Sequence, residues 1–279
     1  MVSFDSTPLG PATLQLATSR STRKTLNVGL FIPCYVDQFY PEVGMATVEV
    51  LERCGIKVVY PEQQTCCGQP MANTGCLDAA RPLVQRFIKT FAPFDYIVAP
   101  SGSCVAMVRH HFHQILEQTP EVARVEASTY ELSEFLTDVL HVSHWEGSFP
   151  HRVGLHQACH GLRELRLAKP SEVVTPSVGK VTQLLERLEG IEFVELERTD
   201  ECCGFGGTFA VSEEAVSVQM GLDRLSDHVA KGAEVLVSAD MSCIMHLKGL
   251  ALRQQLPMRF THVAELLAKY GRGPRFRPS

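Results

Sequence analysis

No apolar run in the 279-residue sequence reaches the roughly 18 residues that a membrane-spanning helix needs. The N-terminus also lacks the basic and then apolar order of a secretory signal. No basic stripe stands out and the formal net charge is −5, which argues against a nucleic-acid-binding protein. A Gly-x-Gly-x-x-Gly loop is missing as well, so nucleotide and flavin binding have no support. These absences predict a cytoplasmic protein without a membrane span.

Cysteine, by contrast, is plentiful, with ten residues in the chain. A secreted protein of this size would use them for disulfides, whereas a cytosolic one more often uses them for metal binding or redox chemistry. Because no export signal is visible, we favour the second interpretation. Hydrophobic residues make up 45% of the sequence and charged residues 20%, so the chain can bury a core and is not disordered.

The sequence contains an internal duplication. Five segments of the first half recur in the same order in the second: 28–34 matches 153–159, 50–53 matches 184–187, 66–68 matches 202–204, 96–99 matches 235–238, and 129–136 matches 261–267. Chance hardly produces five matches in one order. We therefore predict two similar domains, residues 26–140 and 151–271, joined by a short linker at 147–150. Residues 1–25, rich in Ser, Thr and Pro, are expected to form a flexible tail.

Short apolar runs alternate with stretches of helical periodicity in each half. The first half predicts strands at 28–33, 56–60, 95–99 and 122–126 and helices at 42–54, 76–91, 104–117 and 131–140, and the second half predicts strands near 152–157, 191–196, 234–238 and 257–260. Strands that alternate with helices indicate parallel sheets covered by helices. The predicted fold class is therefore α/β, with two similar parallel-sheet halves.

Eight of the ten cysteines keep their positions in the duplication. In each half a strand ends on a cysteine, a Cys-Cys-Gly loop follows the second strand, and a fourth cysteine follows the third; the eight are Cys34, Cys66, Cys67 and Cys104, and Cys159, Cys202, Cys203 and Cys243. Loops at the carboxyl ends of parallel strands converge on one crevice, so the four sulfurs of each half are expected to meet. Four thiolates suit an iron–sulfur or zinc centre. Disulfides are the alternative, and a vicinal one would be strained.

The glycine after each cysteine pair fits an irregular loop. Gly68 and Gly204 can adopt positive φ and let backbone N–H groups approach the sulfurs. The two remaining cysteines have no such pattern. Cys54 falls in an amphipathic helix and Cys76 has no counterpart in the second half, so we expect both to be buried as small hydrophobic residues.

Two copies of the pattern Cys…Cys-Cys-Gly…Cys resemble the cysteine-rich CCG domain of heterodisulfide reductase, glycolate oxidase and lactate utilisation proteins. Residues 39–44, 64–70 and 201–207 are similar to signatures of the lactate utilisation protein A family. Ferredoxin-type Cys-x-x-Cys-x-x-Cys motifs are absent, so the chain resembles the stand-alone form. The resemblance implies a duplicated CCG domain in which the eight repeated cysteines hold one or two iron–sulfur clusters, expected to be [4Fe–4S].

The same resemblance implies a function in lactate utilisation. It points to an electron-transfer subunit of a complex that oxidises L-lactate to pyruvate without NAD. The implied partners are a ferredoxin-type iron–sulfur subunit similar to lactate utilisation protein B and a subunit similar to protein C, which would also provide any contact with the membrane surface. Two alternatives stay open: a subunit of a heterodisulfide-reductase-like disulfide reductase, and a non-enzymatic scaffold stabilised by zinc. Zinc in one half and a cluster in the other is a further variant.

The sequence departs from the full CCG pattern, which ends in Cys-x-x-Cys. Ser101 and Asp240 occupy the first of those positions. The five-cysteine motif holds non-cubane clusters in heterodisulfide reductase, so its absence favours an ordinary [4Fe–4S] cluster. Ser101 is expected to cap a helix or donate a hydrogen bond, whereas Asp240 is either a helix cap or an oxygen ligand.

Several histidines lie near the cysteines. His156 and His160 flank Cys159 and are either proton relays or ligands, or residues hydrogen-bonded near the strand end. His246 follows Cys243 by one helical turn and has the same two interpretations. The group at 110, 111 and 113 is expected on a solvated helix face.

Overall fold

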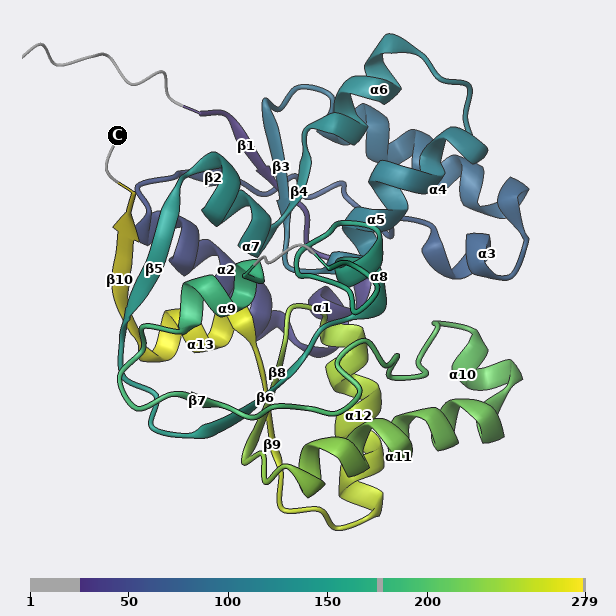
Figure 1. Ribbon diagram of the computed structural model, residues 1–279. Helices are drawn as coiled ribbons and strands as arrows, with labels where there is room; N and C mark the ends of the chain where they lie inside the picture. Colours follow the sequence, from purple (N-terminus) through teal and green to yellow (C-terminus); the bar gives the residue numbers. More distant parts are fainter. Residues whose placement is uncertain (1–25, 175–177, 278–279) are drawn as a thin grey trace, which may run out of the picture.

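The computed structural model describes residues 26–174 and 178–277 (Figure 1). The predicted tail, residues 1–25, lies outside the described residues. Two four-stranded parallel sheets with helices packed around them confirm the predicted α/β fold. A separate two-stranded antiparallel sheet lies beside them.

The first-half elements, in chain order, are β1 (Val28–Leu30), α1 (Cys34–Phe39), α2 (Pro41–Arg53), β2 (Val58–Val59), α3 (Gln69–Asn73), α4 (Leu77–Phe91), β3 (Tyr96–Ala99), α5 (Gly102–His111), the 3-10 helix η1 (Phe112–Gln114), α6 (Pro120–Ala127), β4 (Thr129–Glu131), α7 (Leu132–Glu134), the π-helix η2 (Phe135–Val139) and β5 (Val142–Gly147). The second-half elements are β6 (Arg152–His156), α8 (Cys159–Arg163), α9 (Lys180–Leu185), β7 (Glu192–Phe193), α10 (Phe209–Ser212), α11 (Glu214–Ala230), β8 (Val235–Ser238), α12 (Met241–Arg253), β9 (Arg259–His262), α13 (Val263–Tyr270) and β10 (Gly271–Phe276).

The two large sheets have the same topology. Their strand orders are β2-β1-β3-β4 and β7-β6-β8-β9, so equivalent strands occupy equivalent places. The central strands β3 and β8 are buried along almost their whole length, as expected for apolar strands covered on both faces. In each sheet the first and third strands run parallel side by side, and their carboxyl ends therefore reach the same edge.

An approximate twofold relation joins the halves. Helix α5 packs against α8, and the equivalent helix α12 packs against α1. Likewise α2 packs against α13, and its equivalent α9 packs against α7. Ser101 and Asp240, at equivalent positions of the duplication, face each other in an isolated antiparallel bridge. Figure 1 shows α1 and α8 between the two sheets, at the centre of the molecule, with α5 beside the first sheet and α12 beside the second.

One predicted strand is wrong. Residues 122–126 lie in helix α6, because Thr119 caps it by accepting a hydrogen bond from the Val122 N–H and Pro120 occupies its first turn. The strand follows immediately afterwards, as β4. The pair β5–β10 was not predicted at all, and β5 extends into the expected linker. Trp145 on β5 is completely buried. Within the described residues, no helix is long and apolar enough to cross a membrane.

Candidate metal centre

All eight repeated cysteines line one cavity between the two halves. Each half delivers its four from three places: the start of the helix after its first strand, the Cys-Cys-Gly loop, and the first turn of the helix after its third strand. The convergence expected at the carboxyl edge of each sheet is therefore present, and the twofold relation brings both sets to the same cavity.

In the first half, the Sγ atoms of Cys34 and Cys66 lie 3.6 Å apart. The backbone N–H of Gly68 donates to Cys66 Sγ at 3.4 Å. Gly68 has a φ of 88°, in the left-handed region that favours glycine. Cys67 and Cys104 are buried behind this pair, in one apolar cluster.

The second half repeats this geometry closely. The Sγ atoms of Cys159 and Cys202 lie 3.8 Å apart, and the Gly204 N–H donates to Cys202 Sγ at 3.4 Å. Gly204 has a φ of 85°, and a Cβ there would lie 2.7 Å from the carbonyl oxygen of Ser217. The loop therefore requires glycine for both its backbone conformation and its close packing. Both predictions about these glycines, positive φ and N–H groups near sulfur, are confirmed.

One thiol of each set is poised to be anionic. Hydrogen bonds with Cys34 and Cys67 lower the pKa of the Cys66 thiol to about 3. Hydrogen bonds with Cys159 and Cys203 lower the pKa of the Cys202 thiol to about 2. Thiolates rather than thiols bind metals, so each set begins with one sulfur in the ligating form.

Ser101 and Asp240 act as helix caps, which confirms that interpretation. Ser101 Oγ accepts a hydrogen bond from the Cys104 N–H at 3.4 Å. Asp240 accepts one from the Ser242 N–H at 3.1 Å and, across the interface between the halves, one from the Ser103 N–H at 2.7 Å. The fully buried Asp240 thus caps α12 and also holds the first turn of α5.

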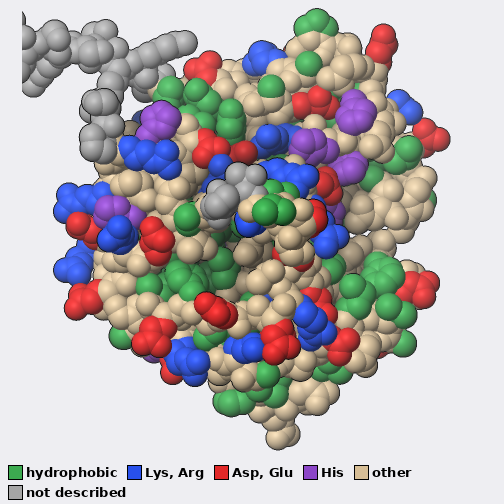
Figure 2. Space-filling view, in the orientation of Figure 1, with side chains coloured by type: hydrophobic (Ala, Val, Ile, Leu, Met, Phe, Trp, Pro, Cys, Tyr) green, Lys and Arg blue, Asp and Glu red, His purple; other side chains and the backbone are tan. Residues whose placement is uncertain are grey.

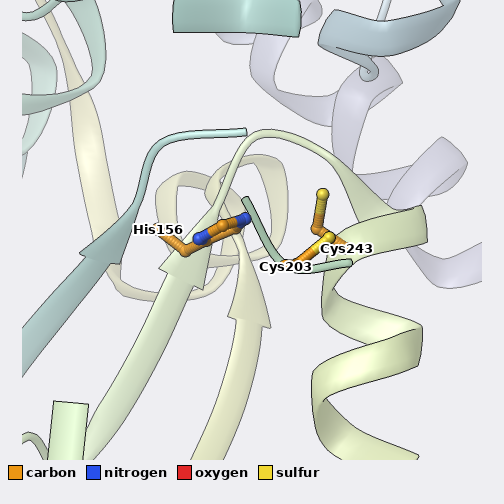
Figure 3. Close-up of side chains that lie close together, drawn as sticks. All are labelled: His156, Cys203 and Cys243. Atoms are coloured by element: carbon orange, nitrogen blue, oxygen red, sulfur yellow. The ribbon is translucent and has the colours of Figure 1, made fainter. Parts of the chain in front are cut away.

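A buried histidine lies beside the second set. The ligand atoms of His156, Cys203 and Cys243 lie within 4.8 Å of one another, a spacing compatible with a metal ion (Figure 3). His156 Nδ1 accepts a hydrogen bond from Arg224 Nε at 3.3 Å. Burial, followed by the charge of Arg224, lowers the pKa of His156 to about 3, so the imidazole is neutral at physiological pH.

The chemistry of this donor set fits a soft metal centre. Each half offers four sulfurs, and the buried His156 Nε2 and Arg224 Nη2 have no hydrogen-bond partner among the described residues. Buried donors without partners are rare and costly. Polar groups of this kind beside thiolates suit a negatively charged group such as an iron–sulfur cluster bound by four thiolates.

His160 contacts the edge of the same set. Its Nδ1 lies 3.6 Å from Cys159 Sγ, and its Nε2 lies 3.7 Å from Glu164. Glu164 also bonds His111 Nε2 at 3.0 Å. Figure 2 shows histidine side chains gathered on the face around α5. His110, His111 and His113 were expected on a solvated helix face. His113 is exposed, whereas His110 and His111 are half-buried.

The cysteines outside the two sets behave differently from each other. Cys54 packs against the core at the end of α2, and burial raises its pKa to about 12. Cys76 was expected to be buried, and this is wrong. It is exposed because it precedes the solvated first turn of α4. His246 Nε2 lies 3.2 Å from the carbonyl oxygen of Ser217. Because a carbonyl oxygen only accepts, Nε2 donates this hydrogen bond and is not free to bind a metal.

Arg224 is the residue that sequence reasoning missed. It is fully buried on α11, bonded to His156 and paired with Asp227 at 3.3 Å. A comparison of the two halves could have found it. Helix α4 is apolar at its core-facing positions, whereas the equivalent helix α11 carries an arginine at one of them.

Comparison with known proteins agrees with this geometry. The family model of the cysteine-rich CCG domain matches residues 28–109 and again residues 153–248. The chain belongs to the CCG family. It is 41% identical over 87% of its length to Lactate utilization protein A of Halalkalibacterium halodurans, covering 96% of that protein. It is also 42% identical to Lactate utilization protein A of Geobacillus kaustophilus, again over 87% of its length and covering 98% of that protein.

These matches confirm the resemblance seen in the sequence, and the chain is a homologue of Lactate utilization protein A. Solved structures are far more distant. Glutamate racemase from Bacillus anthracis aligns with 87% of this chain and 79% of its own length, at a TM-score of 0.35 and 11% identity. That likeness is too weak to bear on fold or function.

Proposed function

We propose that this CCG protein holds an iron–sulfur centre in each half and serves as an electron-transfer subunit of a lactate-oxidising complex. The observation that carries the proposal is the pair of equivalent four-sulfur sets lining one cavity. Each set has a backbone N–H donor from its Cys-Cys-Gly loop. The family relationship supplies the link to lactate.

The chain's own residues would hold and tune the centres. The four cysteines of each half are the proposed ligands, and the Gly68 and Gly204 N–H groups stabilise negative charge on the sulfurs they contact. The buried positions of Cys67, Cys104 and Cys203 keep water from the inner side of each set. A [4Fe–4S] centre bound there would accept and release one electron at a time.

Oxidation of lactate to pyruvate releases two electrons and two protons. Two one-electron centres in one chain suit the passage of such a pair. In the proposed complex, a ferredoxin-type subunit similar to lactate utilisation protein B exchanges electrons with this chain, and a subunit similar to protein C completes the assembly. Tyr35 and Phe205, which pack edge-to-face with ring centroids 5.7 Å apart, line the cavity beside the cysteines, and we propose that electrons from a partner enter there.

The decisive experiment is anaerobic reconstitution followed by iron and sulfide analysis and electron paramagnetic resonance. We expect about eight iron atoms per chain, four for each set of thiolates. Cys67→Ser and Cys203→Ser should each lose about half of the iron, since each variant breaks one set. The matched controls Cys54→Ser and Cys76→Ser should keep all of it. Stoichiometric zinc in place of iron, or no metal at all, would refute the proposal.

A further inference from the structure

The walls behind the two cysteine sets differ in polarity. In the first half, Phe31 packs edge-to-face against Phe87 at 4.9 Å and Phe91 at 5.7 Å between ring centroids. These three rings belong to the same apolar cluster as Cys67 and Cys104. The first set is therefore backed by hydrocarbon.

The duplication identifies the equivalent residues of the second half. Phe31 precedes Cys34 by three residues, as His156 precedes Cys159. Along the helices, a Cβ built on Gly68 would face the Ala80 carbonyl, and one built on Gly204 would face the Ser217 carbonyl. Ala80 and Ser217 are therefore equivalent. Counting seven and eleven residues onward pairs 87 with 224 and 91 with 228.

The second wall thus consists of His156, Arg224 and His228, all of them buried. Arg224 is held in place from several sides: Nε donates to His156 Nδ1, and Nη1 donates to Asp227 and to the Arg198 carbonyl. The same fold therefore carries a polar network where the first half carries three aromatic rings.

This network sets the tautomer of His156. A neutral imidazole has one N–H and one acceptor nitrogen. Because Nδ1 accepts from Arg224, the proton resides on Nε2. Nε2 has no hydrogen-bond partner among the described residues, and the ring extends toward Cys203 and Cys243 in Figure 3. The second set therefore has an unpaired N–H beside it, where the first set has the aromatic side chain of Phe31 at the equivalent position.

We propose that Arg224 is a positioning residue that fixes His156 as an N–H donor to the second cysteine set, so that the centre in the second half has the higher reduction potential. This inference rests on the proposed function, since it requires a redox centre in each half. Reduction adds negative charge to a cluster, and an N–H directed at its sulfurs stabilises that charge. With its proton on Nε2, His156 has no lone pair to offer a metal, so it is a donor rather than a ligand.

A potentiometric titration followed by electron paramagnetic resonance tests the proposal on the reconstituted protein. His156→Phe, which installs the first-half residue, should lower the potential of one centre only, by at least about 59 mV, or tenfold in its reduction equilibrium. Arg224→Lys, which keeps the positive charge but loses the Nε–H that holds His156, should lower the potential of the same centre. Combined with His156→Phe, it should lower the potential no further than His156→Phe alone. His156→Gln, which keeps a side-chain N–H, should restore part of the shift. The control Phe31→Leu should leave that centre unchanged.

A second measurement does not need the cluster. Nitrogen-15 NMR of the metal-free protein under reducing conditions should show His156 protonated at Nε2, and Arg224→Met should populate the Nδ1-protonated form. If no iron binds, the proposed function fails while this test still reports on the network. If two centres form and His156→Phe moves neither potential, or moves both equally, the inference is wrong. Loss of iron from one half in His156→Phe would make His156 a ligand and also overturn it.

Discussion

Asp240 joins the two halves at the cavity, and its replacement by alanine is expected to destabilise the whole chain. Its side chain is fully buried and accepts hydrogen bonds from the N–H groups of Ser242, in its own half, and Ser103, in the other. These N–H groups belong to the first turns of helices α12 and α5, which carry Cys243 and Cys104. A single carboxylate therefore holds one cysteine-bearing helix from each half.

The expected cost is worked from the two backbone N–H bonds, because the Ser101 and Ser242 hydroxyls that also donate to Asp240 can rotate to other partners. Losing the cap of α12 costs about 1 kcal/mol. Leaving the Ser103 N–H without its charged acceptor costs about 2 kcal/mol more. Asp240→Ala should therefore lower the free energy of unfolding by about 3 kcal/mol. Ser101→Ala, at the equivalent position, removes the 3.4 Å bond from the Cys104 N–H together with hydroxyl contacts to Asp240 and Ser103, and should cost about 1 kcal/mol.

Urea unfolding of the metal-free protein under anaerobic, reducing conditions measures both values. Asp240→Asn keeps the shape and one carbonyl acceptor but removes the charge, so its stability should fall between the parent and Asp240→Ala. An Asp240→Ala variant that loses less than about 1 kcal/mol, or no more than Ser101→Ala, would refute the role of this carboxylate between the halves.

Two further predictions concern positions where the halves can be compared directly. Gly204→Ala should destabilise the metal-free protein more than Gly68→Ala, because both have positive φ but a Cβ at Gly204 would lie 2.7 Å from its neighbours against 3.5 Å at Gly68. Equal losses in urea unfolding would contradict this. Burial, followed by the charge of Arg224, lowers the pKa of His228 from 6.5 to about 2, so the unfolded chain binds more protons and stability is lost as pH falls below 6.5. His228→Phe, which installs the residue found at Phe91, should remove about 2 kcal/mol of the loss between pH 6.5 and pH 5, and an unchanged pH dependence would contradict it.

The duplication could be found in the sequence because its chemistry tolerates little change. Only cysteine supplies a thiol side chain, and the turn after each cysteine pair demands positive φ, so both copies keep Cys-Cys-Gly at 66–68 and 202–204. The central strands were equally visible, since burial on both faces leaves an apolar run at 96–99 and at 235–238. These features predicted the two sheets and the location of the eight cysteines.

What the sequence could not predict depends on distant partners. Strand β5 pairs with β10, more than a hundred residues away, and neither has a strong local pattern. Helix α6 was mistaken for a strand because its apolar residues are few, although Thr119 and Pro120 were start signals. The antiparallel bridge between Ser101 and Asp240 forms only when the two halves pack together. No periodicity in either half carries that information.

The two halves share their cysteine pattern but differ in the residues that surround it. Equivalent cysteines and loop glycines make the same closest contacts in the two sulfur sets. If the proposed electron transfer required only two equal centres, the walls behind the two cysteine sets would be expected to have similar polarity. Yet Phe31 and Phe87 are replaced by His156 and Arg224, and a buried arginine is costly to keep. We therefore assign the difference to the proposed redox chemistry: two centres of unequal potential would give an electron a direction through the chain, which two equal centres would not.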